Sequence, residues 1–132
     1  MSNDSAPAPE ISVVIPVFNG SNTLRAVVAS VGEALSGVDY EIVLVDDGST
    51  DDSWATITEL AADPVVRGSR MLKNYGQHSA VVAGLAQARG SWVATIDDDG
   101  QNNPADIPVL LAAAENNEAG ACLHQLRDGG HQ

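Results

Sequence analysis

The residues with the clearest chemical potential are three consecutive carboxylates, Asp97, Asp98 and Asp99, with the amide Gln101 two positions further on. They follow the apolar segment 93–96, which has the character of a buried strand. Adjacent carboxylates repel one another, and a hard divalent cation such as Mg²⁺ or Mn²⁺ relieves that repulsion by taking oxygen ligands. The run therefore predicts a metal site at the carboxyl end of a strand.

A second acidic turn supports this interpretation. The apolar segment 42–45 ends in Asp46 and Asp47, and Asp51 and Asp52 follow in the same turn. In open α/β sheets ligands bind outside the carboxyl ends of the strands, so residues about fifty positions apart can line one pocket. The two turns favour a nucleoside diphosphate bound through a metal. Asp51 and Asp52 are better explained as helix caps and stay outside the predicted site.

Composition narrows the class of protein. The chain has 132 residues, of which 44% are hydrophobic, which suits one domain with one core. A formal charge of −12, from 18 acidic and 6 basic residues, argues against binding to nucleic acid or to an anionic membrane surface. The single Cys122 cannot form an internal disulfide, so a reducing compartment is expected. No apolar run approaches the roughly 20 residues of a membrane span.

The order of apolar segments predicts an α/β domain with a mostly parallel sheet. We expect strands over residues 11–17, 40–45, 70–72 and 91–96. We expect helices between Ser21 or Asn22 and Gly37, between Asp51 or Ser53 and Asp63, from Ser79 to Arg89, and from Pro104 to Asn116. Residues 1–10 are predicted to be a disordered lead-in, 11–119 the domain, and 120–132 a tail of uncertain structure.

Several segments, in this order and spacing, resemble family-two glycosyltransferases. The similarity is strongest to the polyprenyl-phosphate sugar transferases, a branch that includes dolichol-phosphate mannose synthase, and it covers residues 11–111. It implies the glycosyltransferase type A fold, a Rossmann-like α/β sheet flanked by helices, here incomplete at the C-terminus. The segments that carry the resemblance are Val14–Asn19, Val45–Asp51, Asn74–Ala80, Ala83–Leu85 and Asp97–Asn102.

The resemblance implies a donor site at the end of the first two strands. Pro16, Phe18 and Asn19 would line the base and ribose pocket, and Asp46 and Asp47 would hydrogen-bond the base or ribose. Uracil and guanine remain equally open.

Further roles follow from the loop residues. Asp98 and His78 would contact the donor, although a loop histidine such as His78 can equally face solvent. Arg70 and Lys73 either hold the diphosphate or are simply solvated.

The resemblance also implies the catalytic metal site. Asp97 and Asp99 match the outer residues of an Asp-x-Asp motif and are the expected catalytic residues. Asp99 and Gln101, with Asp97, would bind Mg²⁺ or Mn²⁺. The expected reaction is an inverting, metal-dependent transfer of sugar from a UDP- or GDP-sugar to a dolichyl or undecaprenyl phosphate, for a cell-envelope glycan. The expected location is cytoplasmic and peripheral at the inner face of the membrane, with a second copy or a membrane protein as partner.

Alternatives to this interpretation remain. Family catalytic domains continue well beyond this length, so the chain could be a donor-binding remnant or an interaction module without turnover. Its exposed strand edges would then favour dimerisation. A haloacid-dehalogenase-like phosphatase is disfavoured because Gln101 stands where that motif normally has Thr and because the strand is the fourth. A receiver-like acidic pocket is disfavoured because its acidic pair should follow the first strand.

Overall fold

The computed structural model describes residues 8–96, 104–115 and 124–125, and in it five strands form one sheet in the order β3-β2-β1-β4-β5. The strands are β1 (Ile11–Val17), β2 (Tyr40–Asp46), β3 (Val66–Arg70), β4 (Trp92–Thr95) and β5 (His124–Gln125). β1 to β4 run parallel, and β5 runs antiparallel to β4. The prediction of an α/β order with a mostly parallel sheet is confirmed.

The two central strands are buried on both faces. Every residue of β1 is buried, as are those of β2 after Tyr40. Val13 and Ile15 belong to the larger core cluster, whereas Val14 packs with Val43 and Ala80 in a second cluster. Two covered faces require continuous apolar strands instead of alternating ones, and this sequence supplies them.

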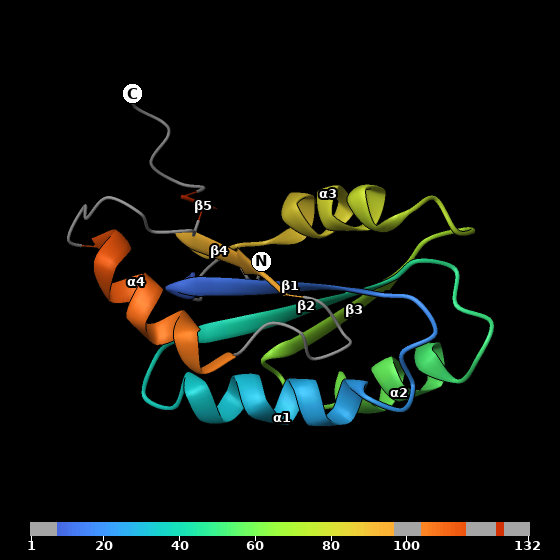
Figure 1. Ribbon diagram of the computed structural model, residues 1–132, viewed down its shortest axis with the longest axis horizontal. Helices are drawn as coiled ribbons and strands as arrows, with labels where there is room; N and C mark the ends of the chain where they lie inside the picture. The colour runs from blue at the N-terminus through green and yellow to red at the C-terminus, as the bar shows by residue number, and fades with distance from the viewer. Residues whose placement is uncertain (1–7, 97–103, 116–123, 126–132) are drawn as a thin grey trace, which may run out of the picture.

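Helices cover both faces of the sheet. Figure 1 shows α1 (Leu24–Ala34) and α2 (Ser53–Leu60) on one face and α3 (Gln77–Gln87) on the other. A short 3₁₀ turn, η2 (Pro104–Asp106), leads into α4 (Ile107–Glu115), which lies at one end of the sheet. The loops that follow β1, β2 and β3 gather at the opposite end (Figure 1).

Two helices, α1 and α3, differ from prediction in their boundaries. α1 has Thr23 at its N-cap instead of Ser21 or Asn22, since the Ser21 hydroxyl donates to Asp51 Oδ2 at 2.9 Å. α3 begins at Gln77 and ends at Gln87, two residues earlier at each end than predicted. Ala88 is extended, and the Arg89 N–H donates to Glu41 Oε2 at 2.7 Å instead of to the helix.

The predicted third strand, 70–72, was wrong: β3 lies at Val66–Arg70 and pairs with β2 from Ile42 to Asp46. Of its five residues only Val66 is buried. Backbone pairing to β2 at the edge of the sheet, and not an apolar pattern, defines this strand. The apolar Leu72, which favoured the later position, is 94% exposed.

The described residues nearest the C-terminus form one strand that was not predicted. β5 lies within the segment 120–132, which was predicted to be a tail of uncertain structure. No helix among the described residues is long and apolar enough to cross a membrane.

Candidate functional site

The loops after β1, β2 and β3 form what we call the carboxyl edge, residues 16–21, 46–53 and 70–77. A cavity of about 200 Å³ opens there, which we call the central cavity. Complete ligand pockets are usually about 300–1,000 Å³, so this one suits a single ring system. Its lining residues are Pro16, Val17, Phe18, Asp47, Asn74, Gly76 and Gln77.

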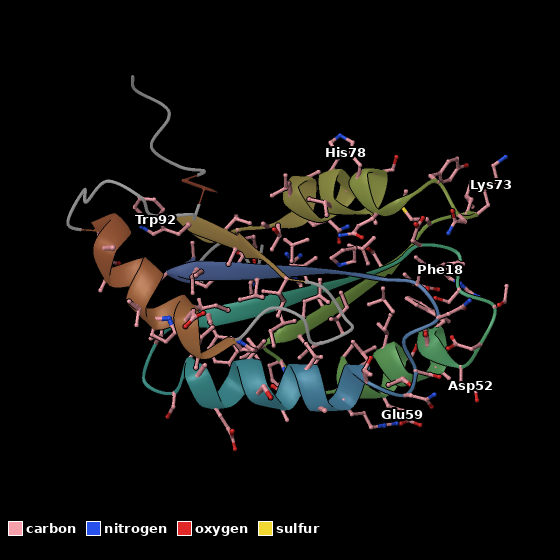
Figure 2. All side chains as sticks on the ribbon, viewed as in Figure 1. Phe18, Asp52, Glu59, Lys73, His78 and Trp92 are labelled. Atoms are coloured by element: carbon pink, nitrogen blue, oxygen red, sulfur yellow. The ribbon has the colours of Figure 1, made fainter. Side chains whose placement is uncertain are left out.

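Pro16 and Phe18 bring apolar surface to this cavity from the end of β1. Pro16 pairs with Val45 of β2, whereas pairing of β1 with β4 stops at Val14. The missing N–H of Pro16 therefore costs no hydrogen bond on the β4 side. Phe18 follows the strand and is 48% exposed, so its ring is accessible at the cavity. Figure 2 shows Phe18 at the carboxyl edge, at the same end of the molecule as Lys73.

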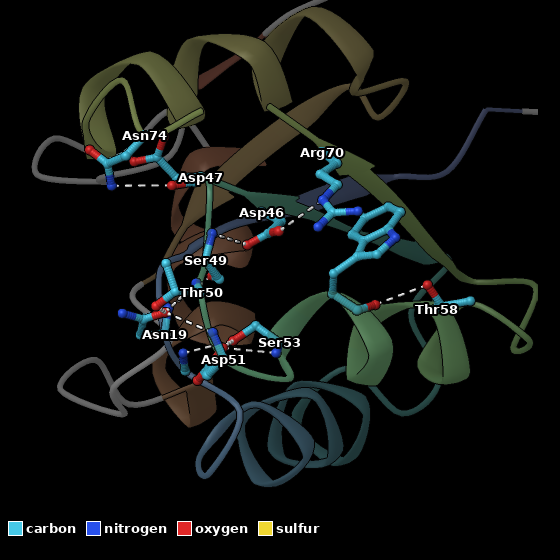
Figure 3. Close-up of polar contacts among 12 residues, drawn as sticks. Asn19, Asp46, Asp47, Ser49, Thr50, Asp51, Ser53, Thr58, Arg70 and Asn74 are labelled. Carbon is cyan, nitrogen blue, oxygen red and sulfur yellow. Dashed lines mark hydrogen bonds and ion pairs between the residues drawn. The ribbon is translucent and has the colours of Figure 1, made fainter. Parts of the chain in front are cut away.

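Asp47 joins two walls of the central cavity. Its carboxylate accepts the Tyr75 N–H at 2.9 Å and the Gly76 N–H at 3.1 Å, and it is 2% exposed. Asn74 Nδ2 donates to the Asp47 carbonyl at 3.1 Å (Figure 3). Gly76 is the N-cap of α3 with φ 105°, a left-handed conformation that glycine adopts readily. Asp47 thus fixes the segment that leads into α3, and each carboxylate oxygen keeps a further lone pair for a ligand.

Asp46 lies below the turn and does not line the cavity. It is fully buried, and its Oδ1 accepts the Ser49 N–H at 3.2 Å. Its Oδ2 has no hydrogen-bond partner and lies 3.7 Å from Arg70 Nε (Figure 3). The Arg70 guanidinium in turn lies over the Trp54 ring, 5.3 Å from its centroid. The predicted pair of donor-binding aspartates is therefore divided: Asp47 faces the central cavity and Asp46 supports the turn.

Asn19, the third residue predicted in the base pocket, faces the neighbouring loop instead of lining the cavity. Its Oδ1 accepts the Thr50 N–H at 2.8 Å and the Asp51 N–H at 3.3 Å. Its own N–H donates to Ser49 Oγ at 2.9 Å. The side chain joins the loop after β1 to the loop after β2 (Figure 3).

Asp51 caps α2, as the sequence predicted, from one position before the N-cap Asp52. Desolvation alone would raise the pKa of Asp51. Hydrogen bonds from the N–H and hydroxyl of Ser53 and of Ser21 outweigh it and lower the pKa to about 2. Asp52 occupies the N-cap position of α2, as predicted, although its side chain makes no capping hydrogen bond.

The cationic loop residues surround a second hollow of about 500 Å³, the lateral cavity. It is lined by Gly48, Ser49, Arg70, Met71, Leu72, Lys73 and Asn74. Lys73 Nζ lies over the Tyr75 ring, 5.6 Å from its centroid. His78 is exposed on the outer side of α3, pointing away from the sheet (Figure 2). His78 therefore lies apart from both cavities.

The predicted metal and catalytic residues, Asp97, Asp98, Asp99 and Gln101, lie outside the described residues. Ile96, the last described residue before them, donates its N–H to the Val14 carbonyl at 3.1 Å. Within the described part of the chain no group of three or more His, Cys, Asp or Glu residues could hold a metal ion.

Comparison with known proteins decides the family. Residues 12–131 match the sequence profile described as Glycosyl transferase family 2. The chain belongs to glycosyl transferase family 2.

Four lining residues of its central cavity had no predicted role: Val17, Asn74, Gly76 and Gln77. The glycine ahead of α3 was the available signal, since its positive φ sets the entry of the helix.

Relatives of this family-two chain include two proteins named undecaprenyl-phosphate 4-deoxy-4-formamido-L-arabinose transferase. The protein from Enterobacter sp. (strain 638) is 42% identical over 113 residues, and the match covers 80% of this chain and 34% of that protein. The protein from Yersinia pestis (strain Pestoides F) is 43% identical, with 83% and 35% covered. The chain thus spans about a third of the length of these relatives.

Solved structures confirm the type A fold. S. aureus TarS 1-349 in complex with UDP-GlcNAc has a TM-score of 0.67 and 25% identity, covering 81% of this family-two chain and 31% of that one. The mannosyltransferase PcManGT from Pyrobaculum calidifontis, solved with GDP-Man and Mn²⁺, has a TM-score of 0.68 and 21% identity. That match covers 83% of this chain and 32% of that one, and it supports the fold alone.

Proposed function

We propose that this chain provides the donor-binding part of a transferase. The enzyme would move a sugar from a nucleoside diphosphate sugar to a polyprenyl phosphate, either dolichyl or undecaprenyl, for a cell-envelope glycan. The observation that carries the proposal is the central cavity, where Pro16, Phe18 and Asp47 meet within a family-two domain. The names of the relatives support the acceptor class, because both name undecaprenyl phosphate.

The central cavity suits the base of the donor. Pro16 and Phe18 offer an apolar wall on which a flat ring can pack, and such aromatic stacking contributes about 1–3 kcal/mol per base. The Asp47 carboxylate offers acceptor lone pairs to a ring N–H. Both uracil and guanine carry such a donor, so the proposal covers UDP- and GDP-sugars. TarS and PcManGT, solved with a UDP-sugar and a GDP-sugar respectively, are structural neighbours with each base.

The proposed reaction is a single displacement at the anomeric carbon. An oxygen of the acceptor phosphate forms the new bond, and the bond to the nucleoside diphosphate breaks on the opposite face, so configuration inverts. The leaving diphosphate keeps the electron pair. A phosphate monoester has a second pKa of about 6, so the acceptor is largely ionised near neutral pH and needs no strong protein base.

A divalent cation completes the proposal. Asp97, Asp99 and Gln101 offer carboxylate and amide oxygens, hard ligands that suit Mg²⁺ and Mn²⁺. When bound, the cation would neutralise charge that develops on the departing diphosphate. Asp98 remains a proposed donor contact, whereas His78 lies on the outer side of α3, apart from the central cavity that would hold the base. A lipid-bound acceptor would place the reaction at the inner face of the membrane. A second copy of the chain or a membrane protein would be the partner there.

Calorimetric titration with UDP and GDP, each with and without Mn²⁺, tests the proposal. We expect one nucleotide to bind more tightly with Mn²⁺ and the gain to disappear in Asp99→Ala. Asp52→Ala is the matched control, because it removes an exposed carboxylate that makes no capping hydrogen bond. Equal binding by Asp99→Ala and the parent chain would refute the metal assignment. Absence of binding by folded protein would leave a remnant without donor recognition as the better explanation.

A further inference from the structure

Among the described residues, Asn19 alone combines a side chain with a positive φ, 53°. Asparagine tolerates this left-handed conformation better than most residues, but it still needs support from its surroundings. The support comes entirely from the loop after β2. The strained position therefore marks a place where two loops of the carboxyl edge are fixed to each other.

The contacts of Asn19 form a compact set, which we call the loop latch. Its carboxamide oxygen accepts the Thr50 N–H, the Thr50 hydroxyl at 3.3 Å and the Asp51 N–H. The next two residues continue the seam: the Gly20 N–H donates to Ser53 Oγ at 2.9 Å, and Ser21 donates to Asp51. The carboxamide oxygen is thus committed to protein partners.

Phe18 lies between two anchored positions. On one side the Val17 carbonyl accepts the Asp47 N–H at 2.8 Å, and on the other side Asn19 is held by the latch. Backbone fixed on both sides restricts where the Phe18 ring can lie, and that ring forms a wall of the central cavity. The half-exposed ring is otherwise only partly enclosed by the protein.

We propose that Asn19 is a positioning residue, which holds Phe18 in the wall of the central cavity and does not itself contact the donor. The inference rests on the proposed function for its effect on nucleotide affinity. The position of the Phe18 ring can be tested without any nucleotide. Two substitutions separate the roles: Asn19→Gly keeps the positive φ and removes the oxygen acceptor, whereas Asn19→Asp keeps both.

The first measurement uses the fact that Phe18 is the chain's one phenylalanine. Incorporated fluorophenylalanine gives a single ¹⁹F signal that reports the ring. We expect Asn19→Gly to shift or broaden this signal and Asn19→Asp to leave it near its original position. An unchanged signal in Asn19→Gly would overturn the proposal, whether or not the chain binds nucleotide.

The second measurement is nucleotide affinity at 0.5 M salt, where long-range effects of the added Asp charge are screened. We expect Asn19→Gly to weaken binding about tenfold, the scale of one lost base–aromatic contact, and Asn19→Asp to stay within about threefold. Equal losses in both variants would mean that the Asn19 amide contacts the ligand directly, which contradicts the proposal.

A control separates positioning from general destabilisation. Ser12→Ala removes a buried hydroxyl that bonds Glu41 at 2.6 Å, far from the latch at the other end of the strands. We expect it to lower the melting temperature at least as much as Asn19→Gly without changing nucleotide affinity. If Ser12→Ala weakened binding as strongly, loss of affinity would reflect overall stability and the proposal would fail. If the parent chain binds no nucleotide, the proposed function fails and the ¹⁹F result alone decides the role of Asn19.

Discussion

The two ends of the parallel strands use carboxylates in opposite ways. At the amino edge, which we define as Glu10, Ser12, Glu41, Arg67 and Arg89 with their contacts, a buried acid is surrounded by partners. At the carboxyl edge the acids Asp46 and Asp47 are equally buried but keep unused acceptor capacity. The buried acid at the amino edge is a completed structural element, whereas at the carboxyl edge Asp46 supports the turn and Asp47 lines the central cavity, where a ligand could reach it.

Glu41 shows how complete the amino edge is. Its Oε2 accepts the Ser12 hydroxyl at 2.6 Å and the Arg89 N–H at 2.7 Å. Its Oε1 lies 3.2 Å from the Nε atoms of both Arg67 and Arg89. Burial would raise the pKa of Glu41, but the hydrogen bonds from Ser12 and Arg89 and the two positive charges together lower it. Only Arg67 Nε lacks good hydrogen-bond geometry in this group.

The carboxyl edge differs because its loops, and not its strands, supply the partners. Asp47 and Asn19 each direct side-chain oxygens to backbone N–H groups of a neighbouring loop. Such contacts set the positions of cavity walls while leaving the cavity itself open. Rigid loops around an open pocket are what ligand binding requires. The comparison predicts that damage to the carboxyl edge alters binding, whereas damage to the amino edge alters stability alone.

The largest effect is expected from Gly48→Ala at the carboxyl edge. Gly48 has φ 75°, and an added Cβ would lie 2.4 Å from the Asn74 backbone nitrogen. Left-handed strain and a backbone clash each cost roughly 1–3 kcal/mol, so we expect a loss of about 3–4 kcal/mol in unfolding free energy. Urea titration measures the loss. Displacement of Asn74 should also weaken nucleotide binding more than tenfold, measured by calorimetry.

Gly37→Ala is the matched control for that experiment. Gly37 has φ 87° but nothing lies within 4 Å of an added Cβ, and it is remote from both cavities. Only the left-handed strain of about 1–2 kcal/mol applies there. Similar losses of affinity in the two alanine variants would remove the assignment of Gly48 to the site.

Glu41→Gln should produce the next largest effect, on stability only. The amide brings N–H groups against donors from Ser12 and Arg89 and removes the charge that both arginines face. Breaking a buried ion pair costs about 3–5 kcal/mol, and the partly exposed arginines reduce this to about 2–3 kcal/mol. Urea titration should show this loss at pH 7 while nucleotide affinity stays unchanged.

The pH dependence of Glu41→Gln provides a further check. Because the pKa of Glu41 is lowered on folding, its contribution is present above about pH 4.5 and is lost as the pH falls through the folded value. The difference between variant and parent should therefore shrink in acid. Glu59→Gln, in the exposed pair with Arg25, serves as control and should change stability by less than about 1 kcal/mol. An equally large loss in that control would contradict the special status of Glu41.

The smallest effect concerns Glu10, also at the amino edge. A hydrogen bond with Glu115, together with burial and the charges of Glu115 and Asp39, raises the pKa of Glu10 from 4.5 to about 7. Because the pKa of Glu10 is raised on folding, this residue stabilises the fold fully below pH 4.5, and its contribution is lost as the pH rises through about 7. Glu10→Gln should therefore have a melting temperature that falls less than that of the parent between pH 5 and pH 8. Glu33→Gln changes an exposed carboxylate on α1, and its melting temperature should fall with pH as that of the parent does. If the melting temperature of Glu10→Gln also falls as much as that of the parent, the pairing of Glu10 with Glu115 is excluded.

Most of the fold could be predicted from local pattern. β1 and β2 are buried runs rich in Val and Ile, and α1 carries its buried Leu24, Val27 and Val31 at helical spacing. These signals are strong because two-sided burial and amphipathic burial each impose a period on the sequence. β3 was misplaced because an edge strand with one buried residue imposes no such period.

The candidate site, like the fold, could be predicted from the sequence only in part. The sequence by itself determined that the acidic turn with Asp46 and Asp47 follows a strand and that this strand lies in a mostly parallel sheet. Only the tertiary structure decided that Asp47 lines the cavity, that Asp46 lies beneath it and that Asn19 joins two loops. Adjacent residues in a turn point in different directions, and their partners lie about 30 residues away in sequence. Such contacts leave no periodic trace, because they depend on where separate loops meet in space.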